Sequence, residues 1–325
     1  MTNLSTKYLG LQLKNPVVVS SSGLTNSIEK IQKIENYGAA AVVLKSLFEE
    51  QINFESGKLE QNSDYPEASD YILNYTKSNN VSEYLDLIEE SKKLVQIPVI
   101  PSINCISSKE WISFAKNIES AGADAIELNI FFLPIEKTKS AADYEKKYLD
   151  LVENVISQVK LPVSVKLGRN FTNPAYIVDQ LYKRGVKGVV LFNRFYEPDI
   201  DIENMKIVSS EVLSSPADIR QSLRWIGIIS GLDIKMSIAA STGIHSSDDV
   251  IKQVLAGADV AMICSTLYKS GLNQIETIVN GIEKWMNKKG FIDLNSFKGK
   301  MSYKGIPDAT LYERSQFMKY FSNMQ

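Results

Sequence analysis

Short apolar runs rich in β-branched residues recur along the chain at even spacing. Eight such runs can be recognised, at residues 15–21, 39–46, 97–103, 124–130, 161–167, 186–192, 234–241 and 258–264. They do not alternate apolar and polar positions, so both faces of each run are expected to be buried, as in a parallel sheet.

Segments with the helical period of apolar residues lie between these runs. Four of them start near a Ser or Asn cap residue and stop at a glycine, at residues 27–38, 107–122, 173–185 and 246–257. The repetition of strand and helix predicts an α/β protein with a (β/α)₈ TIM barrel fold. A doubly wound open sheet is the second possibility.

The barrel is expected to form a single domain over residues 1–325, with two segments outside the simple repeat. Residues 47–80 form a polar insertion after the second strand, and residues 290–325 form a C-terminal extension. Insertions that follow barrel strands lie on the face that carries active sites, so residues 47–80 are expected near the site. The alternative is that they form a solvated loop with no role there.

Composition narrows the class of protein. Hydrophobic residues make up 44% of the 325 residues and the net charge is −2, so a globular core is expected and a nucleic-acid surface is not. The N-terminus lacks a signal-peptide core, and no apolar run reaches the roughly 18 residues of a membrane span. Two distant cysteines suggest a reduced, cytoplasmic setting. No set of residues has metal-ligand spacing, and the single histidine supports no Ser-His-Asp arrangement.

The carboxyl ends of barrel strands converge on one pocket, so the residues there are the candidates for chemistry. Lys45 and Lys166 end otherwise apolar strands, and a buried ammonium is costly unless it meets an anion or acceptor. Both lysines together favour a ligand site, although an ion pair with a neighbouring carboxylate such as Glu127 is the alternative for either one. The loops at 240–249 and 264–271 follow the last two strands, where barrels often bind phosphate.

Several blocks of sequence match one family in order and spacing. They include "YLGLQLKNPVVVSSSGLT", "AAAVVLKS", "LPVSVKLG", "VVLFNR" and "STGIHSSDDVIKQVLAGADVAMICSTLY". The chain resembles the class 1 dihydroorotate dehydrogenases, which are FMN-containing (β/α)₈ enzymes of pyrimidine biosynthesis. The resemblance implies FMN as cofactor, a small-molecule substrate, a cytosolic enzyme and, commonly, a homodimer. Fumarate, NAD through a partner subunit or a quinone are all possible electron acceptors by this resemblance.

The resemblance also implies roles for individual residues. Lys45 and Lys166 would lie beside flavin and substrate, and Lys166 would stabilise negative charge on the reduced flavin. Asn129 and Asn193 would bind the substrate. The cofactor would be held by these two lysines together with Ser21, Ser22, Gly23, Ser46, Thr242, Gly243, Cys264, Ser265 and Thr266.

The stretch "ELNIFFLP", residues 127–134, departs from the family pattern. The family usually continues "ELNLSCPN", in which the cysteine is the base that removes a proton from dihydroorotate. Phe132 occupies that position, and general-base catalysis contributes about 10²–10⁴-fold. Cys105 is the candidate replacement base, with a small buried filler as the alternative. Arg194 stands where a serine is usual; it would either pair with a substrate carboxylate or lie exposed.

Three functional interpretations follow. The first is an FMN-dependent dehydrogenase of CH–CH groups whose substrate is dihydroorotate or another unsaturated acid or dihydropyrimidine, with Phe132 and Arg194 in an altered substrate site. The second is a catalytically silent barrel, with or without flavin, that has a regulatory or interaction role. The third is a barrel that binds a different phosphorylated metabolite at the last two strand loops.

Overall fold

The computed structural model describes residues 2–48, 81–105, 109–195 and 197–313; the side chains of residues 105–113 are not described. Ten parallel strands form one sheet in the order β5-β7-β8-β9-β10-β13-β14-β3-β4-β6. Their bounds are β3 (Val17–Val19), β4 (Ala41–Val43), β5 (Leu47–Phe48), β6 (Val99–Ile100), β7 (Ser102–Cys105), β8 (Ile126–Ile130), β9 (Val163–Leu167), β10 (Gly188–Leu191), β13 (Ser237–Ser241) and β14 (Val260–Ile263).

The sheet closes on itself at Pro101. Only this residue separates β6, which pairs with β4, from β7, which pairs with β8. Proline has no N–H to donate to a ladder, so one chain segment appears as two strands. The eight predicted apolar runs therefore all form strands of the barrel, and the (β/α)₈ prediction is confirmed. The two-residue strand β5 was not predicted.

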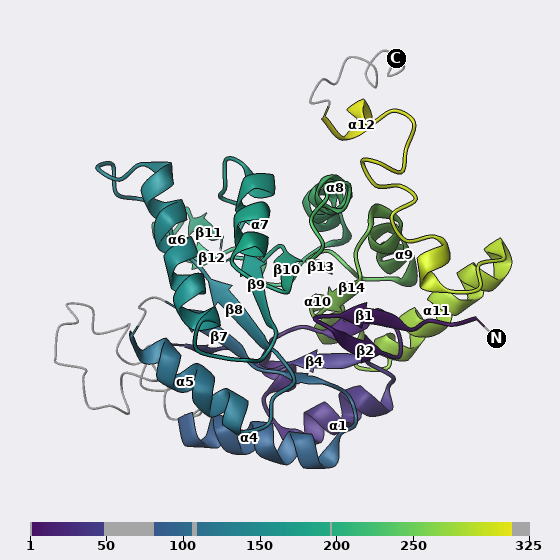
Figure 1. Cartoon of the computed structure of the whole chain (residues 1–325), viewed down its shortest axis with the longest axis horizontal. Helices are drawn as coiled ribbons and strands as arrows, with labels where there is room; N and C mark the ends of the chain where they lie inside the picture. Colours follow the sequence, from purple (N-terminus) through teal and green to yellow (C-terminus); the bar gives the residue numbers. More distant parts are fainter. Residues whose placement is uncertain (1, 49–80, 106–108, 196, 314–325) are drawn as a thin grey trace.

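Helices surround the sheet (Figure 1). They are α1 (Ile28–Asn36), α4 (Val81–Leu94), α5 (Lys109–Ser120), α6 (Ala141–Ile156), α7 (Pro174–Lys183), α8 (Ile219–Ser230), α9 (Ser247–Ala256), the short α10 (Ser265–Ser270) and α11 (Gln274–Lys289). Each of the four predicted helices is present as α1, α5, α7 and α9. The caps are the predicted ones at α7, where Asn173 accepts from Tyr176 N, and at α9, where Ser246 accepts from Asp249 N.

Two hairpins were not predicted, and they lie at opposite ends of the barrel. In Figure 1 the hairpin β1 (Thr6–Tyr8) and β2 (Leu11–Leu13) lies in front, whereas β11 (Pro198–Asp201) and β12 (Lys206–Ser209) are drawn faint in the distance, near α6. Tyr8 and Leu13 of the front hairpin are buried with small barrel residues such as Ala41, Ala125 and Ala239. Side chains of this hairpin thus fill the amino-terminal end of the barrel interior.

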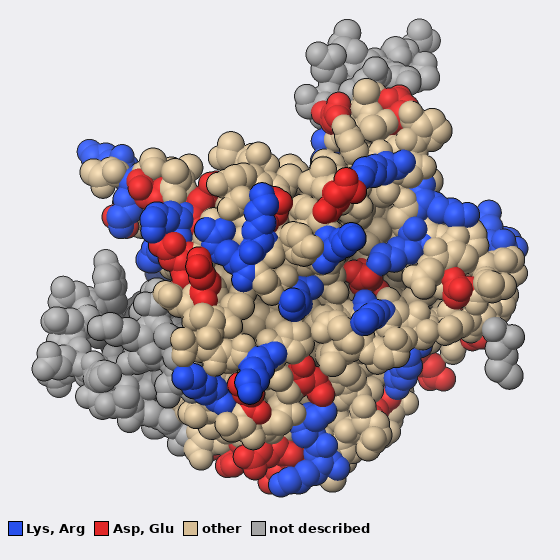
Figure 2. Space-filling view, viewed as in Figure 1, with Lys and Arg blue, Asp and Glu red and all other residues tan. Residues whose placement is uncertain are grey.

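The chain beyond α11 packs Leu294 and Phe297 into the main core. Its described part contains the turn Leu294–Ser296 and the short α12 (Thr310–Glu313), while residues 314–325 lie outside the described residues. Of the predicted insertion at 47–80, only β5 is described. None of the described helices is both long and apolar enough to cross a bilayer. Acidic and basic side chains are interspersed on the face seen in Figure 2.

Candidate functional site

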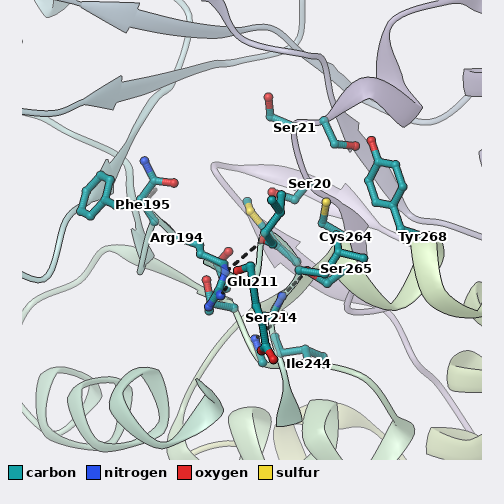
Figure 3. Close-up of a pocket in the computed structure, with 18 of the residues that line it drawn as sticks. Ser20, Ser21, Arg194, Phe195, Glu211, Ser214, Ile244, Cys264, Ser265 and Tyr268 are labelled. Carbon is teal, nitrogen blue, oxygen red and sulfur yellow. Dashed lines mark hydrogen bonds between the residues drawn. The ribbon is translucent and has the colours of Figure 1, made fainter. Parts of the chain in front are cut away.

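A cavity of about 650 Å³ lies at the carboxyl ends of five barrel strands. Residues after β3, β10 and β14 line it together with the ends of β9 and β13. Figure 3 shows Phe195 and Tyr268 on opposite sides of this pocket, with Ser20, Cys264 and Ser265 between them. Of the residues predicted from strand ends, the lining includes Ser21, Ser22, Lys166, Asn193, Arg194, Thr242, Gly243, Cys264 and Ser265.

Lys166 places a buried ammonium at this pocket. The residue is 7% exposed and lines the cavity from the end of β9. Its Nζ lies 3.4 Å from Ser20 Oγ and 3.9 Å from Glu127 Oε1, both longer than a strong charge-assisted hydrogen bond. The ion pair with Glu127, which the sequence left open as the alternative to a bound ligand, is therefore present, but the distance between its charged atoms is long. An ammonium in this setting can still donate to a bound acceptor.

Two asparagines form an amide pair beside the lysine. Asn193 Nδ2 donates to Asn129 Oδ1 at 2.7 Å, and Asn129 is the register partner of Lys166 on the neighbouring strand. Asn193 lines the pocket, whereas Asn129 adjoins it through this hydrogen bond. The amide donors and acceptors that this hydrogen bond does not use can hold a polar ring, as the family resemblance implies for a substrate site.

The loop after β13 has a strained backbone. Thr242 and Gly243 have φ values of 76° and 77°, and a left-handed β-branched residue is uncommon. Such strain concentrates at ligand-binding loops. A Cβ at Gly243 would come within 2.2 Å of Ile219 N, so only glycine fits against the start of α8.

Ser214 lies over the predicted phosphate loops. Its N–H donates to Ser265 Oγ at 2.9 Å, and its Oγ is 3.4 Å from Gly243 N, which donates to it. Lys269 Nζ donates to its carbonyl oxygen at 2.8 Å. Ser214 Oγ also lies 3.2 Å from His245 Nε2, and burial is the main reason that the pKa of this histidine is lowered. One cation, two hydroxyls and two backbone N–H groups thus gather where phosphate is expected.

Arg194 holds the segment that carries Ser214. Its guanidinium donates to the carbonyl oxygens of Glu211, at 2.6 Å, and Val212, at 3.1 Å. It also contacts Asp218 Oδ2 at 3.2 Å. The Arg194 side chain is therefore not simply exposed. It cannot leave this loop without breaking three contacts.

The two phenylalanines of "ELNIFFLP" point to different places. Phe131 stacks against the pocket residue Phe195, with ring centroids 4.0 Å apart. Phe132 instead packs edge-on to Tyr148 of α6, with Lys147 Nζ 4.2 Å from its ring centroid. Phe132 lines a separate cavity of about 90 Å³ and not the main pocket. The position predicted for a base therefore carries a side chain that packs against α6.

The remaining predicted residues lie around the pocket. Lys45 is half-buried just outside the lining, and burial lowers its pKa, with a smaller effect from Lys30. Ser46 is buried and contacts pocket residue Ser21, and Gly23 faces Tyr268, since a Cβ there would be 3.0 Å from its hydroxyl. Thr266 is buried and donates to the His245 carbonyl oxygen. The side chain of Cys105 lies outside the described residues.

Several lining residues were missed from the sequence. Ser20, Phe195, Tyr268 and the segment 209–214 all face the cavity. Segment 209–214 follows an unpredicted hairpin, so no strand end pointed to it.

Burial raises the pKa of Cys264, although Ser22 and Lys166 oppose the shift, and the residue is therefore a thiol at neutral pH. In the described part of the chain, no three His, Cys, Asp or Glu side chains are grouped as metal ligands.

A closed parallel barrel with a polar pocket at its carboxyl strand ends has the architecture of the barrel enzymes. Residues 3–286 match the family model of dihydroorotate dehydrogenase, so the chain belongs to the dihydroorotate dehydrogenase family. Membership makes it an oxidoreductase of the type that acts on CH–CH groups.

Curated relatives cover almost the whole chain. The catalytic subunit of dihydroorotate dehydrogenase B (NAD(+)) from Thermoplasma acidophilum is 26% identical over 92% of this chain and 99% of its own length. The subunit of the same name from Methanocaldococcus jannaschii is 28% identical over 88% of this chain and 94% of its own. Dihydroorotate dehydrogenase A (fumarate) from Limosilactobacillus reuteri is 26% identical over 80% of this chain and 86% of its own length.

Proteins of this family are flavoproteins, and the residues of the pocket fit an FMN group. The cavity of about 650 Å³ is within the range of cofactor sites. Lys166 offers a buried ammonium whose two protein contacts are long. In the loop after β13, Gly243 N makes only a 3.4 Å contact with Ser214 Oγ. A phosphate oxygen could take the place of this hydroxyl as the acceptor.

Proposed function

We propose that the chain is an FMN-dependent dehydrogenase that interconverts dihydroorotate and orotate, or a closely related dihydropyrimidine or unsaturated acid, through an altered substrate site. The observation that carries this proposal is the loosely paired Lys166 ammonium beside the Asn129–Asn193 amide pair in a family pocket. FMN, when bound, supplies a two-electron acceptor.

Each end of the pocket would hold one part of the cofactor. Lys166 would stabilise negative charge on the ring system, because a preorganised cation in a desolvated site interacts strongly with developing charge. Gly243 N–H, Ser265 and Lys269 would hold the phosphate. Ser21, Ser22, Gly23 and Ser46 would position the ring edge, while Thr242, Cys264 and Thr266 would shape the phosphate loops. Lys45 would face the substrate side.

The substrate side is where we propose a departure from the family pattern. Asn129 and Asn193 would hold the substrate ring, while Phe131 and Phe195 form an aromatic wall beside them. Phe132 would act as a packing residue, since its ring contacts Tyr148 and Lys147 of α6. Arg194 would secure segment 209–214 over the pocket and would not pair with a substrate carboxylate. Cys105 remains a candidate base.

A silent flavin-binding barrel with a regulatory role is the second candidate function. The observation that favours it is Phe132, because a phenylalanine that packs on α6 leaves no base at this position. The buried Lys166 opposes only a flavin-free form of this barrel, since an ammonium costs free energy to bury and a bound flavin would supply its acceptor.

Anaerobic reduction separates these functions. The purified protein is expected to carry a flavin absorption band that bleaches when dihydroorotate is added. Lys166→Met is expected to weaken FMN binding and slow bleaching, and Lys284→Met on α11, which does not line the pocket, serves as the control. A yellow protein that no dihydropyrimidine or enoate reduces would support the silent barrel. A colourless protein that also fails to take up added FMN would contradict both.

We also propose a homodimer formed through the β11–β12 hairpin. Ile200 and Ile207 are register partners on this hairpin and are 62% and 67% exposed. Exposed apolar clusters of this kind mark interaction surfaces.

The cytoplasmic location expected from the sequence stays a prediction.

A further inference from the structure

A chain of three serine hydroxyls leads from the pocket into the barrel. Ser21, which lines the pocket, has its Oγ 3.1 Å from Ser46 Oγ. Ser46 Oγ lies 2.9 Å from Ser102 Oγ, and Ser102 Oγ donates to Glu127 Oε1 at 3.3 Å. Ser46, Ser102 and Glu127 are all buried. The hydrogen-bonded path is therefore continuous from the ligand cavity to a carboxyl group that solvent cannot reach.

Glu127 is an unusual residue for a barrel interior. It is 0% exposed, and its Oε2 has no hydrogen-bond partner among the described residues. Burial raises the pKa of this carboxyl, while the charge of Lys166 and the hydrogen bond from Ser102 act in the opposite direction. The group therefore takes up a proton more readily than a surface glutamate. A buried, incompletely bonded carboxyl is costly to stability, so a role beyond packing is expected.

The charged and titratable groups that face Glu127 are few in the described part of the chain. Lys166 Nζ on β9 lies 3.9 Å from Glu127 Oε1. The charge of Glu127 also acts on the hydroxyls of Tyr8 on β1 and Tyr84 on α4. The pKa of each tyrosine is raised, chiefly by burial, so both stay neutral. Because both tyrosines stay neutral, Glu127 is the group in this cluster whose carboxylate can accept a proton.

We infer that Glu127 is the internal proton acceptor of the pocket and that Ser102, Ser46 and Ser21 relay the proton to it. This inference rests on the proposed function and supplies what Phe132 cannot. The substrate C–H proton adds to Ser21 Oγ as the Ser21 proton passes to Ser46, the Ser46 proton to Ser102 and the Ser102 proton to Glu127. The accompanying hydride would be accepted by FMN, the oxidant of the proposed function. Each serine ends with one proton, and the carboxylate becomes a carboxylic acid.

Glu127 acts through the serines and does not touch the pocket, so it is a positioning residue. Its protonation also alters the charge beside Lys166. The proton must return to solvent after each turnover, and reversal of the same path from Glu127 to Ser21 accomplishes this.

The first test needs neither flavin nor turnover. Infrared difference spectra of the purified protein, recorded across a pH series, should contain the carbonyl stretch of a protonated buried carboxyl that is missing in Glu127→Gln. Ser102→Ala should shift the pH midpoint of this band, because it removes the hydrogen bond to Oε1. Ser164→Ala is the control, since Ser164 is buried one strand away but donates to the Ile126 carbonyl. A protein without such a band at any pH would overturn the inference.

The second test measures the relay itself. Anaerobic flavin bleaching by dihydroorotate, or by whichever dihydropyrimidine reduces the wild type, is followed by stopped flow across pH. Ser102→Ala and Glu127→Gln should slow it by about 10²-fold, the lower end of general-base effects, and should abolish the acidic limb of the pH profile. Ser102→Thr keeps a hydroxyl and should restore most of the rate. Equal rates and pH profiles in Ser102→Ala and Ser164→Ala would refute the relay.

These two arms keep the inference separate from the proposed function. If no substrate reduces the wild-type flavin, the proposed function fails while the infrared titration still reports on Glu127. If the wild type turns over but Glu127→Gln matches it at every pH, the proposed function stands and the relay fails.

Discussion

At the scale of single residues, the side chains in and around the pocket are placed in two ways, by the strand ends that carry them and by contacts with distant segments. Lys166, Asn193 and Gly243 were placed at strand ends and indeed line one pocket, because the carboxyl ends of parallel strands meet. Phe132 was recognised as a departure, yet its packing on Tyr148 depends on α6, a helix outside the local pattern. The role of Glu127 as a possible ion-pair partner was visible, whereas its serine path depends on contacts across four segments.

Phe132→Ala gives a residue-scale prediction. Phe132 is half-buried, so the free energy of unfolding should fall by about 1–3 kcal/mol, less than the ~3–5 kcal/mol of a fully buried phenylalanine. Flavin content should not change, because this ring lines the smaller cavity. Denaturant melts and the ratio of flavin to protein absorbance measure both quantities.

Phe195→Ala is the matched comparison. Phe195 lines the main pocket and stacks on Phe131, so this variant should bind FMN more weakly. Loss of flavin in Phe132→Ala but not in Phe195→Ala would mean that the assignment of the two rings is reversed.

At the scale of elements, the parallel barrel was predictable and the antiparallel hairpins were not. Buried strands such as β10 and β14 have uninterrupted apolar sequences, and the helices between the strands carry clear caps, so periodicity and capping sufficed. Strand β12 is exposed at every residue, so burial did not impose a pattern on its sequence. The pocket segment 209–214, which follows this hairpin, was consequently missed.

Gly243→Ala tests the junction between the β13–α9 loop and the start of α8. The positive φ alone should cost about 1–2 kcal/mol, and the new Cβ would lie 2.2 Å from Ile219 N. Relief of that overlap adds about 1–3 kcal/mol, so the variant should lose about 2–5 kcal/mol of unfolding free energy. Chemical denaturation measures the loss.

Gly38→Ala is its control, because Gly38 also has a positive φ but no atom within 4 Å of the new Cβ. This variant should lose only the backbone part, about 1–2 kcal/mol. Equal losses in the two variants would show that the contact between Gly243 and α8 is not close.

At the scale of the whole molecule, the two ends of the barrel differ in how they are covered. The β1–β2 hairpin buries Tyr8 and Leu13 in the barrel interior. The β11–β12 hairpin instead leaves Ile202, Met205 and Ile207 at 78%, 88% and 67% exposure. An isolated two-stranded hairpin is marginally stable in water, so a surface that covers it is expected. A second copy of the chain related by a twofold axis would bring the same apolar patch against itself.

The double variant Ile200→Lys/Ile207→Lys should therefore convert a dimer into a monomer. These two residues are cross-strand partners, so both lysines would fall on one face and would repel their copies across the twofold axis. Light scattering during size-exclusion chromatography should show a halved mass, with unchanged circular dichroism. Ile292→Lys is the control, because Ile292 is 74% exposed but lies in the segment after α11. A monomeric wild type, or a double variant that stays dimeric, would place the self-association surface elsewhere or exclude it.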